Sequence, residues 1–154
     1  MVVIADRPGR VMGIDPGTVR LGIALSDPDR LVATGHAVVP GGDDAPQAIA
    51  KIAQDQQVRT IIVGWPRGLS GEETPASLAA RDLADKLQGL MGPDVHVELM
   101  DERFSSRQAD RGPRDRPRLS AKKQRAKRAS GERDMAAAQV ILASWLEQSH
   151  TGEG

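Results

Sequence analysis

The sequence of 154 residues contains no cysteine, and this absence removes several kinds of chemistry at once. Disulfide bonds, zinc sites with cysteine ligands, iron–sulfur clusters and thiol catalysis all need cysteine. Aromatic residues are scarce as well, because Trp65, Phe104 and Trp145 are the only three. So few rings argue against a protein that binds nucleic acid mainly by stacking its bases.

Long hydrophobic runs are also missing. The longest apolar stretch, residues 136–146, is interrupted by two polar residues and is too short to span a bilayer. The first ten residues carry three charges and lack the apolar core of a signal peptide. We therefore expect a soluble, cytoplasmic protein, and the length of the chain predicts a single domain over residues 1–154.

Net charge is absent because 21 basic residues balance 21 acidic ones. The zero net charge results from a basic segment and an acidic remainder that cancel each other. Residues 103–133 hold 12 Lys and Arg against 3 Asp and Glu, so this segment carries +9 and the remainder −9. Two prolines, Pro113 and Pro117, prevent one continuous helix here, and we expect a basic mobile loop at about 103–130 or a pair of short helices. Like charges at this density repel one another unless a polyanion is nearby, and the alternative is a solvated loop without a partner.

The hydrophobic pattern predicts three strands followed by alternating helices and strands. Short apolar runs bounded by turn residues predict strands at 11–15, 21–27, 31–39, 59–64 and 95–100. Apolar residues at helical spacing predict helices from residue 43 or 44 to about 56, from about 74 to 90 and from 131 to 148. Tightly joined early strands followed by helix–strand units predict an α/β fold with a five-stranded mixed sheet, three antiparallel strands and then parallel strands, flanked by helices.

Three acidic positions stand out by where they lie. Asp15 ends the first predicted strand, Asp101 and Glu102 end the fifth, and Asp134 lies in the first turn of the last helix. Carboxylates gathered at strand ends repel each other unless a cation joins them, and hard oxygen ligands suit Mg²⁺ or Mn²⁺. Two such ions about 4 Å apart can activate a water and stabilise the leaving oxygen of a phosphodiester. An acidic centre next to a basic segment is therefore the arrangement that nuclease chemistry requires.

Each of these acids also has a simpler interpretation, as a turn former, a surface ion-pair partner or a helix-end charge. If the first strand, the fifth strand and the last helix meet at one edge of the sheet, a common metal site explains the three acids better than these separate roles do. Trp65, at the end of the fourth predicted strand, has two interpretations, a surface wedge for nucleic acid or a cover of the core. The three histidines show no metal-ligand spacing, and no Ser/His/Asp triad can be argued.

Motifs in a fixed order over about residues 10–148 carry a resemblance to a known family. They are Gly13-Ile14-Asp15-Pro16-Gly17-Thr18, Gly22-Ile23-Ala24-Leu25-Ser26-Asp27, Ile61-Ile62-Val63-Gly64-Trp65-Pro66, Gly71-Glu72-Glu73, Asp101-Glu102-Arg103-Phe104-Ser105-Ser106, and Asp134-Met135-Ala136-Ala137-Ala138. In these motifs the chain resembles the YqgF family, also called RuvX. The resemblance implies an RNase H-like fold, related to the Holliday junction resolvase RuvC.

The resemblance also implies a divalent-metal-dependent endonuclease acting on structured nucleic acid. Family members are linked to maturation of the 16S rRNA precursor end, and some are described as acting on branched DNA. On this basis Asp15, Glu102 and Asp134 are expected to be catalytic and to hold two Mg²⁺ or Mn²⁺ ions, with Asp101 as a further candidate ligand. The expected nucleic-acid contacts are Thr18, Arg20, Arg103, Ser105, Arg107, Lys122, Lys123, Arg125, Lys127 and Arg128.

Two other functions compete with the nuclease. The hairpin Gly-Ile-Asp-x-Gly-Thr also suits phosphate binding in actin-like ATPases and sugar kinases, although that class generally needs two such domains. The other competitor is a non-catalytic RNA-binding factor of ribosome assembly, which predicts association with the ribosome. A symmetric junction cutter needs two active sites, so that form of the nuclease interpretation predicts a homodimer.

Overall fold

The structure is a computed structural model, and it describes residues 8–17, 19–67, 70–102 and 132–152. Within these residues the strands form one sheet in the order β3-β2-β1-β4-β5. β2 pairs antiparallel with β1 and β3, whereas β4 pairs parallel with β1 and β5. The predicted order of elements and the mixed sheet are confirmed. In chain order the elements are β1 (Arg10–Asp15), β2 (Arg20–Ser26), β3 (Ala33–Pro40), α2 (Ala45–Asp55), β4 (Val58–Trp65), α3 (Pro75–Met91), β5 (His96–Asp101) and α6 (Glu132–Gly152).

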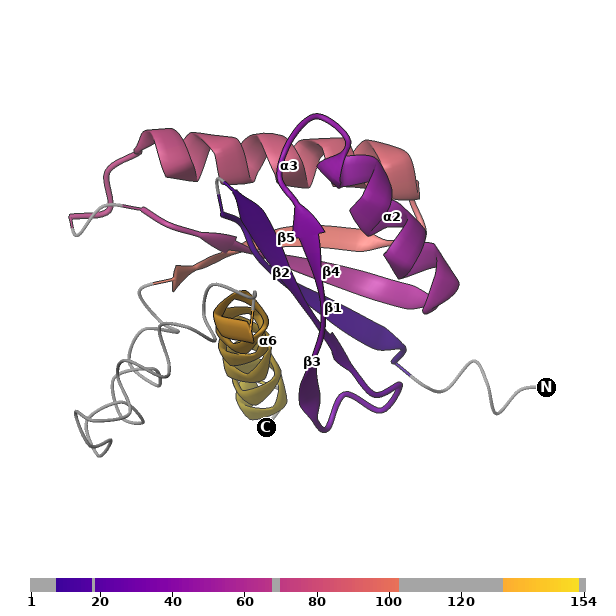
Figure 1. Cartoon of the computed structure of the whole chain (residues 1–154). Coiled ribbons are helices and arrows are strands. Elements are labelled where there is room, and N and C mark those ends of the chain that lie inside the picture. The colour runs from indigo at the N-terminus through magenta and orange to yellow at the C-terminus, as the bar shows by residue number, and fades with distance from the viewer. Residues whose placement is uncertain (1–7, 18, 68–69, 103–131, 153–154) are drawn as a thin grey trace.

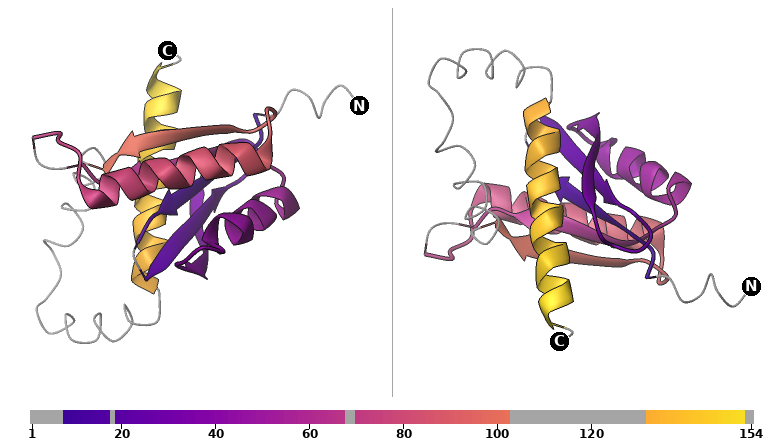
Figure 2. Two further views of the ribbon diagram at one scale, coloured as in Figure 1. Left: turned by 90° about the horizontal axis from the view of Figure 1, so that it is seen from above. Right: turned by 90° about the horizontal axis from the view of Figure 1, so that it is seen from below.

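Helices cover both faces of the sheet (Figure 1). α2 and α3 pack on one face and α6 crosses the other, as the two views of Figure 2 show. The pleat divides the strand residues between two hydrophobic cores, because successive side chains point to opposite faces. In β1, Met12 and Ile14 belong to the core under α2 and α3, and Val11 belongs to the core under α6. The face that any strand-end side chain reaches is therefore fixed by its register.

α6 lies so close to the sheet that two strand positions below it, Gly13 and Gly22, have no room for a side chain. A Cβ atom added to Gly22 would lie 1.9 Å from the carbonyl oxygen of Asp134, and one added to Gly13 would lie 2.7 Å from Cβ of Leu142. No side chain fits at these distances, so the glycines allow the backbone of the helix to approach the strands. The first turn of α6 consequently lies directly over β2.

Most observed boundaries lie within about one residue of the predicted ones, but the start of β3 and the end of α6 differ by more. β3 begins at Ala33 instead of residue 31, because the backbone N–H groups of Leu31 and Val32 each donate to Oδ1 of Asp27 at 2.8 Å. These bonds keep the two residues in the turn and leave both side chains exposed. α6 continues to Gly152, beyond the predicted end at residue 148.

The first turns of α3 and α2 differ in how they are capped. Thr74 caps α3 with a reciprocal capping box, in which its side chain accepts from the N–H of Ser77 at 3.1 Å. Asp44 stands at the N-cap of α2, but its side chain makes no capping hydrogen bond. The predicted start of the last helix and the predicted basic loop at about 103–130 lie outside the described residues. None of the helices within the described ranges combines the length and apolar character needed to cross a membrane.

Candidate active site

The ends of β1 and β5 meet the first turn of α6 at one edge of the sheet. β1, β4 and β5 run parallel, so their carboxyl ends lie at the same edge. Asp15 is the last residue of β1, Glu102 follows the last residue of β5, and Asp134 lies in the first turn of α6. The structure thus brings the three predicted acids to one place.

Two glycines beside Asp15 make room for the other two acids. In the β1–β2 pair Asp15 stands opposite Gly22, the position directly below the backbone of Asp134. On the other side of β1, Gly64 of β4 leaves the space into which Glu102 extends, since a Cβ atom there would lie 3.1 Å from Oε1 of Glu102. Glu102 therefore reaches Asp15 over Gly64, and the backbone of Asp134 lies over Gly22 on the other side of Asp15.

The pleat separates Asp101 from Glu102. Met100 belongs to the core under α6, so Glu102, two residues later, reaches the α6 face, and Asp101 reaches the opposite face. The contacts agree with this alternation. Glu102 forms a hydrogen bond with Asp15, whereas Oδ2 of Asp101 lies 3.5 Å from Nη1 of Arg67. The geometry favours Glu102 over Asp101 as the companion of Asp15.

A hydrogen bond joins the side chains of Asp15 and Glu102. Burial is the largest cause that raises the pKa of Glu102, to about 7, and the negative charges of Asp15 and Asp101 and the hydrogen bond to Asp15 raise it further. Burial also raises the pKa of Asp15, and the nearby Asp134 adds to this, while the hydrogen bond from Glu102 and the charge of Arg133 oppose it. Protonated Glu102 thus donates to the carboxylate of Asp15.

Asp134 forms an ion pair with Arg20. Nε of Arg20 donates to Oδ2 of Asp134 at 3.0 Å, across 114 residues of sequence. Among the described residues, no group of three or more His, Asp or Glu side chains already stands in position to hold a metal ion. The acids are gathered, with two joined by a proton and the third joined to a guanidinium.

A second cluster lies at the same edge on the α3 face of the sheet. Trp65 and Asp101 are neighbours across β4 and β5, and the guanidinium of Arg67 lies over the indole ring, 4.5 Å from its centroid. Arg67 also donates through Nε to the carbonyl oxygen of Gly71 at 2.9 Å. Trp65 packs against the core beneath α3, which agrees with its interpretation as a cover of the core. The cluster connects Arg67 and Gly71 to the end of β5.

The sequence did not indicate Arg67, because nothing local marks its pairing with Asp101, 34 positions later. Of the expected nucleic-acid contacts, Arg20 lies within the described residues, on β2. The others, Thr18, Arg103, Ser105, Arg107, Lys122, Lys123, Arg125, Lys127 and Arg128, lie outside them.

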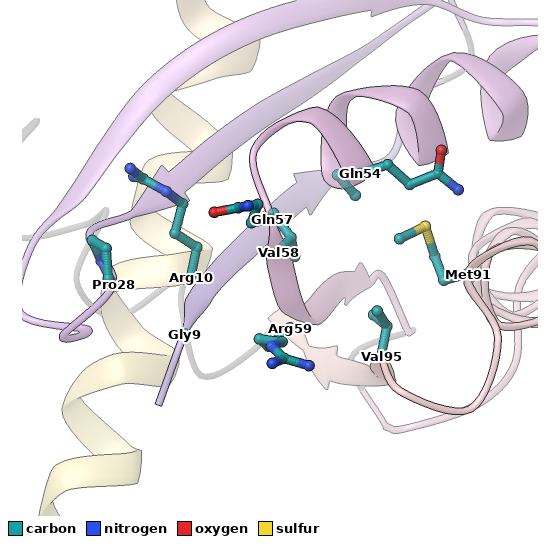
Figure 3. A pocket seen from close by; sticks show the side chains of 10 residues that line it. Gly9, Arg10, Pro28, Gln54, Gln57, Val58, Arg59, Met91 and Val95 are labelled. Atoms are coloured by element: carbon teal, nitrogen blue, oxygen red, sulfur yellow. The ribbon is translucent and has the colours of Figure 1, made fainter. Parts of the chain in front are cut away.

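A cavity of about 550 Å³ lies at the opposite edge of the sheet (Figure 3). Its lining includes Arg10 at the start of β1, Val58 at the start of β4 and Met91 at the end of α3. Because parallel strands begin at one edge and end at the other, this cavity is separated from the acids by the length of the strands. It therefore takes no part in the candidate site.

Known proteins support a single family for the chain. The family model described as "RuvX: Holliday junction resolvase" matches residues 9–148. A protein of Nocardia farcinica (strain IFM 10152) named "Putative pre-16S rRNA nuclease" is 38% identical over 151 residues, covering 91% of this chain and 78% of the relative. A protein of Anaeromyxobacter sp. (strain K) with the same name is 39% identical over 141 residues, covering 90% and 97%.

Solved structures show the same fold at low sequence identity. The T. thermophilus RuvC in complex with Holliday junction substrate has a TM-score of 0.59 and 13% identity, covering 94% of this chain and 96% of that one. The Fowlpox virus resolvase in complex with Holliday junction DNA has a TM-score of 0.54 and 13% identity, covering 90% and 97%. The expected RNase H-like, RuvC-related fold is confirmed, and the chain belongs to the RuvX family.

Proposed function

We propose that this protein is a divalent-metal-dependent endonuclease that hydrolyses phosphodiester bonds in structured nucleic acid. The observation that carries the proposal is the gathering of three acids at one edge of the sheet, with Glu102 hydrogen-bonded to Asp15 over Gly64 and the backbone of Asp134 over Gly22. Burying two carboxylates side by side costs free energy that hydrophobic side chains would avoid. A fold that gathers three acids over two glycines is best explained by a cation that they bind together.

The donor set fits Mg²⁺ or Mn²⁺. All three side chains offer carboxylate oxygens, the ligands that hard divalent cations prefer, and the described part of the site contributes no sulfur or imidazole. The proton in the Asp15–Glu102 hydrogen bond occupies the place that a metal ion would take, so metal binding would release it. We assign Asp15, Glu102 and Asp134 as the residues that hold the ions, and we leave Asp101 out because it pairs with Arg67 on the other face.

The side chains of the site have separate tasks in the reaction. A bound divalent cation supplies an activated water and positive charge for the leaving oxygen. Glu102 would release its proton to solvent, so that the carboxylates of Asp15 and Glu102 could both hold the cation. Asp134 closes the site from the α6 side. Arg20, at the rim, offers a guanidinium to a phosphate oxygen of the substrate.

The substrate is a nucleic acid with a defined shape, either the 16S rRNA precursor end or a four-way junction. The names of the relatives favour the first, and the resolvase complexes favour the second. The +9 segment 103–133 supports either, because several Lys and Arg contacts to phosphates supply affinity without reading sequence. Cutting a junction symmetrically requires two sites and therefore a homodimer.

A side-by-side cleavage assay tests this function. A four-way DNA junction and a 16S precursor end are incubated with Mg²⁺ or Mn²⁺ and with the unaltered protein, Asp15→Asn or Asp94→Asn. Asp94 lies in the exposed α3–β5 connection at the far edge of the sheet and serves as the matched control. We expect cleavage of one substrate by the unaltered and control proteins and none by Asp15→Asn, which still binds. Unchanged cleavage by Asp15→Asn would refute the assignment, and binding without cleavage by any form would instead identify a non-catalytic RNA-binding factor.

A further inference from the structure

We propose that Arg20 is a positioning residue that holds Asp134 in the metal-free protein, releases it when a divalent cation binds, and then pairs with a phosphate of the substrate. This inference rests on the proposed function and adds to it a specific task for one guanidinium.

The Arg20–Asp134 contact is close but open to exchange. Nε of Arg20 lies 3.0 Å from Oδ2 of Asp134, well within hydrogen-bond distance. The two side chains are 37% and 22% exposed, so the guanidinium keeps access to solvent while it pairs. A half-exposed ion pair of this kind is weak, which makes it replaceable by a stronger interaction.

Charge balance explains why a cation replaces the guanidinium. In this structure the guanidinium of Arg20 balances the charge of Asp134. A divalent cation held by the acids would bring two positive charges to the same carboxylate. Because its charge repels the guanidinium next to the same carboxylate, Asp134 cannot keep both partners at full strength.

The release of Arg20 links metal binding to substrate binding. A guanidinium presents several N–H groups in a planar fork that suits phosphate oxygens, and Arg20 is partly exposed and lies 3.0 Å from one of the three acids. When the cation takes Asp134, Arg20 loses its carboxylate and gains affinity for the incoming phosphate. Cation and nucleic acid should then strengthen each other's binding reciprocally.

The first experiment measures binding of Mn²⁺ alone by titration calorimetry at pH 8. Arg20→Gln removes the competing charge from Asp134, so we expect it to bind Mn²⁺ about twofold to fivefold more tightly than the unaltered protein. The matched control is Arg133→Gln, because Arg133 is exposed, lies next to Asp134 in sequence and influences Asp15 only through its charge. An equal gain in both variants would mean that only the net charge matters, and it would overturn the inference.

The second experiment needs no variant and therefore does not depend on how Arg20→Gln folds. The Nε–Hε resonance of Arg20 is followed by NMR while Mg²⁺ is added to the full-length protein. We expect this N–H to be protected from solvent exchange before the addition and to exchange faster at saturation. Mg²⁺ binding that moves other resonances but leaves this one protected would overturn the inference alone, whereas no binding of Mg²⁺ or Mn²⁺ would overturn the proposed function as well.

Discussion

Glu102 donates a hydrogen bond to Asp15 across the glycine at position 64. This contact joins the end of β5 to the end of β1, although β4 lies between the two strands in the sheet. In the metal-free protein it depends on one proton. The stability of the fold and the affinity of the site for cations should therefore both depend on pH.

Glu102→Gln should stabilise the metal-free protein at alkaline pH. The pKa of Glu102 is about 7 in the fold, above its ordinary value of 4.5, so the fold favours the protonated form. The protonated Glu102 side chain therefore stabilises the fold fully below about pH 4.5, and this contribution is lost as pH rises through 7. Glutamine keeps an N–H donor and carries no charge. Because part of the side chain is open to solvent, we expect a gain of about 1 to 2 kcal/mol at pH 8 and little change at pH 5.

Urea denaturation in the presence of a chelator, at pH 5 and pH 8, measures this difference. Glu147→Gln is the matched control, since it makes the same substitution at an exposed position of α6. A Glu102→Gln protein that is no more stable than the unaltered protein at pH 8 would contradict the protonated state of Glu102 in its hydrogen bond with Asp15.

Divalent cations should raise the melting temperature more at pH 8 than at pH 6. Below the pKa of Glu102 a proton competes with the cation for the Asp15–Glu102 pair, and above it the site is free of that competitor. Thermal melts with and without excess Mn²⁺ give the shift at each pH. Asp15→Asn should abolish the shift, and Asp94→Asn should retain it. A shift of the same size at both pH values would show that metal binding releases no proton from this pair.

The two adjacent acids at the end of β5 should behave differently when neutralised. Glu102→Gln should lose Mn²⁺ binding, because its oxygen lies beside Asp15 on the α6 face. Asp101→Asn should keep Mn²⁺ binding and lose about 1 kcal/mol of stability, because it breaks the ion pair with Arg67 on the other face. Titration calorimetry and urea denaturation of the two variants separate these effects. Loss of Mn²⁺ binding in Asp101→Asn to the same degree would show that Asp101 is also a ligand.

The sequence predicted the sheet from short-range patterns, and the resemblance to the YqgF family grouped the three acids. Short apolar runs bounded by turn residues marked the strands, and the carboxyl ends of parallel strands must share an edge. The choice between Asp101 and Glu102 could not be made in the same way. It depends on the register of β5, and a shift of one residue exchanges the faces of the two side chains.

The partners of the acids were beyond prediction for a different reason. Arg20 and Asp134 are 114 residues apart, and no local pattern selects one arginine among many. The start of β3 was predicted too early because the carboxylate of Asp27 binds backbone N–H groups that would otherwise extend the strand. Side-chain bonds of this kind compete with strand pairing without changing the hydrophobic pattern.

Gly22→Ala should disrupt the site through backbone contact alone. The added Cβ atom would lie 1.9 Å from the carbonyl oxygen of Asp134, so the first turn of α6 must move away from β2. We expect a loss of several kcal/mol of stability, within the range of overpacked sites, together with loss of Mn²⁺ binding. Gly89→Ala is the matched control, because Gly89 lies in α3 with nothing within 4 Å of an added Cβ atom and should gain up to about 1 kcal/mol from higher helix propensity. Urea denaturation of both variants, followed by Mn²⁺ titration of whichever folds, measures the outcome. A Gly22→Ala protein as stable as the unaltered one would show that α6 does not lie against β2 at this distance.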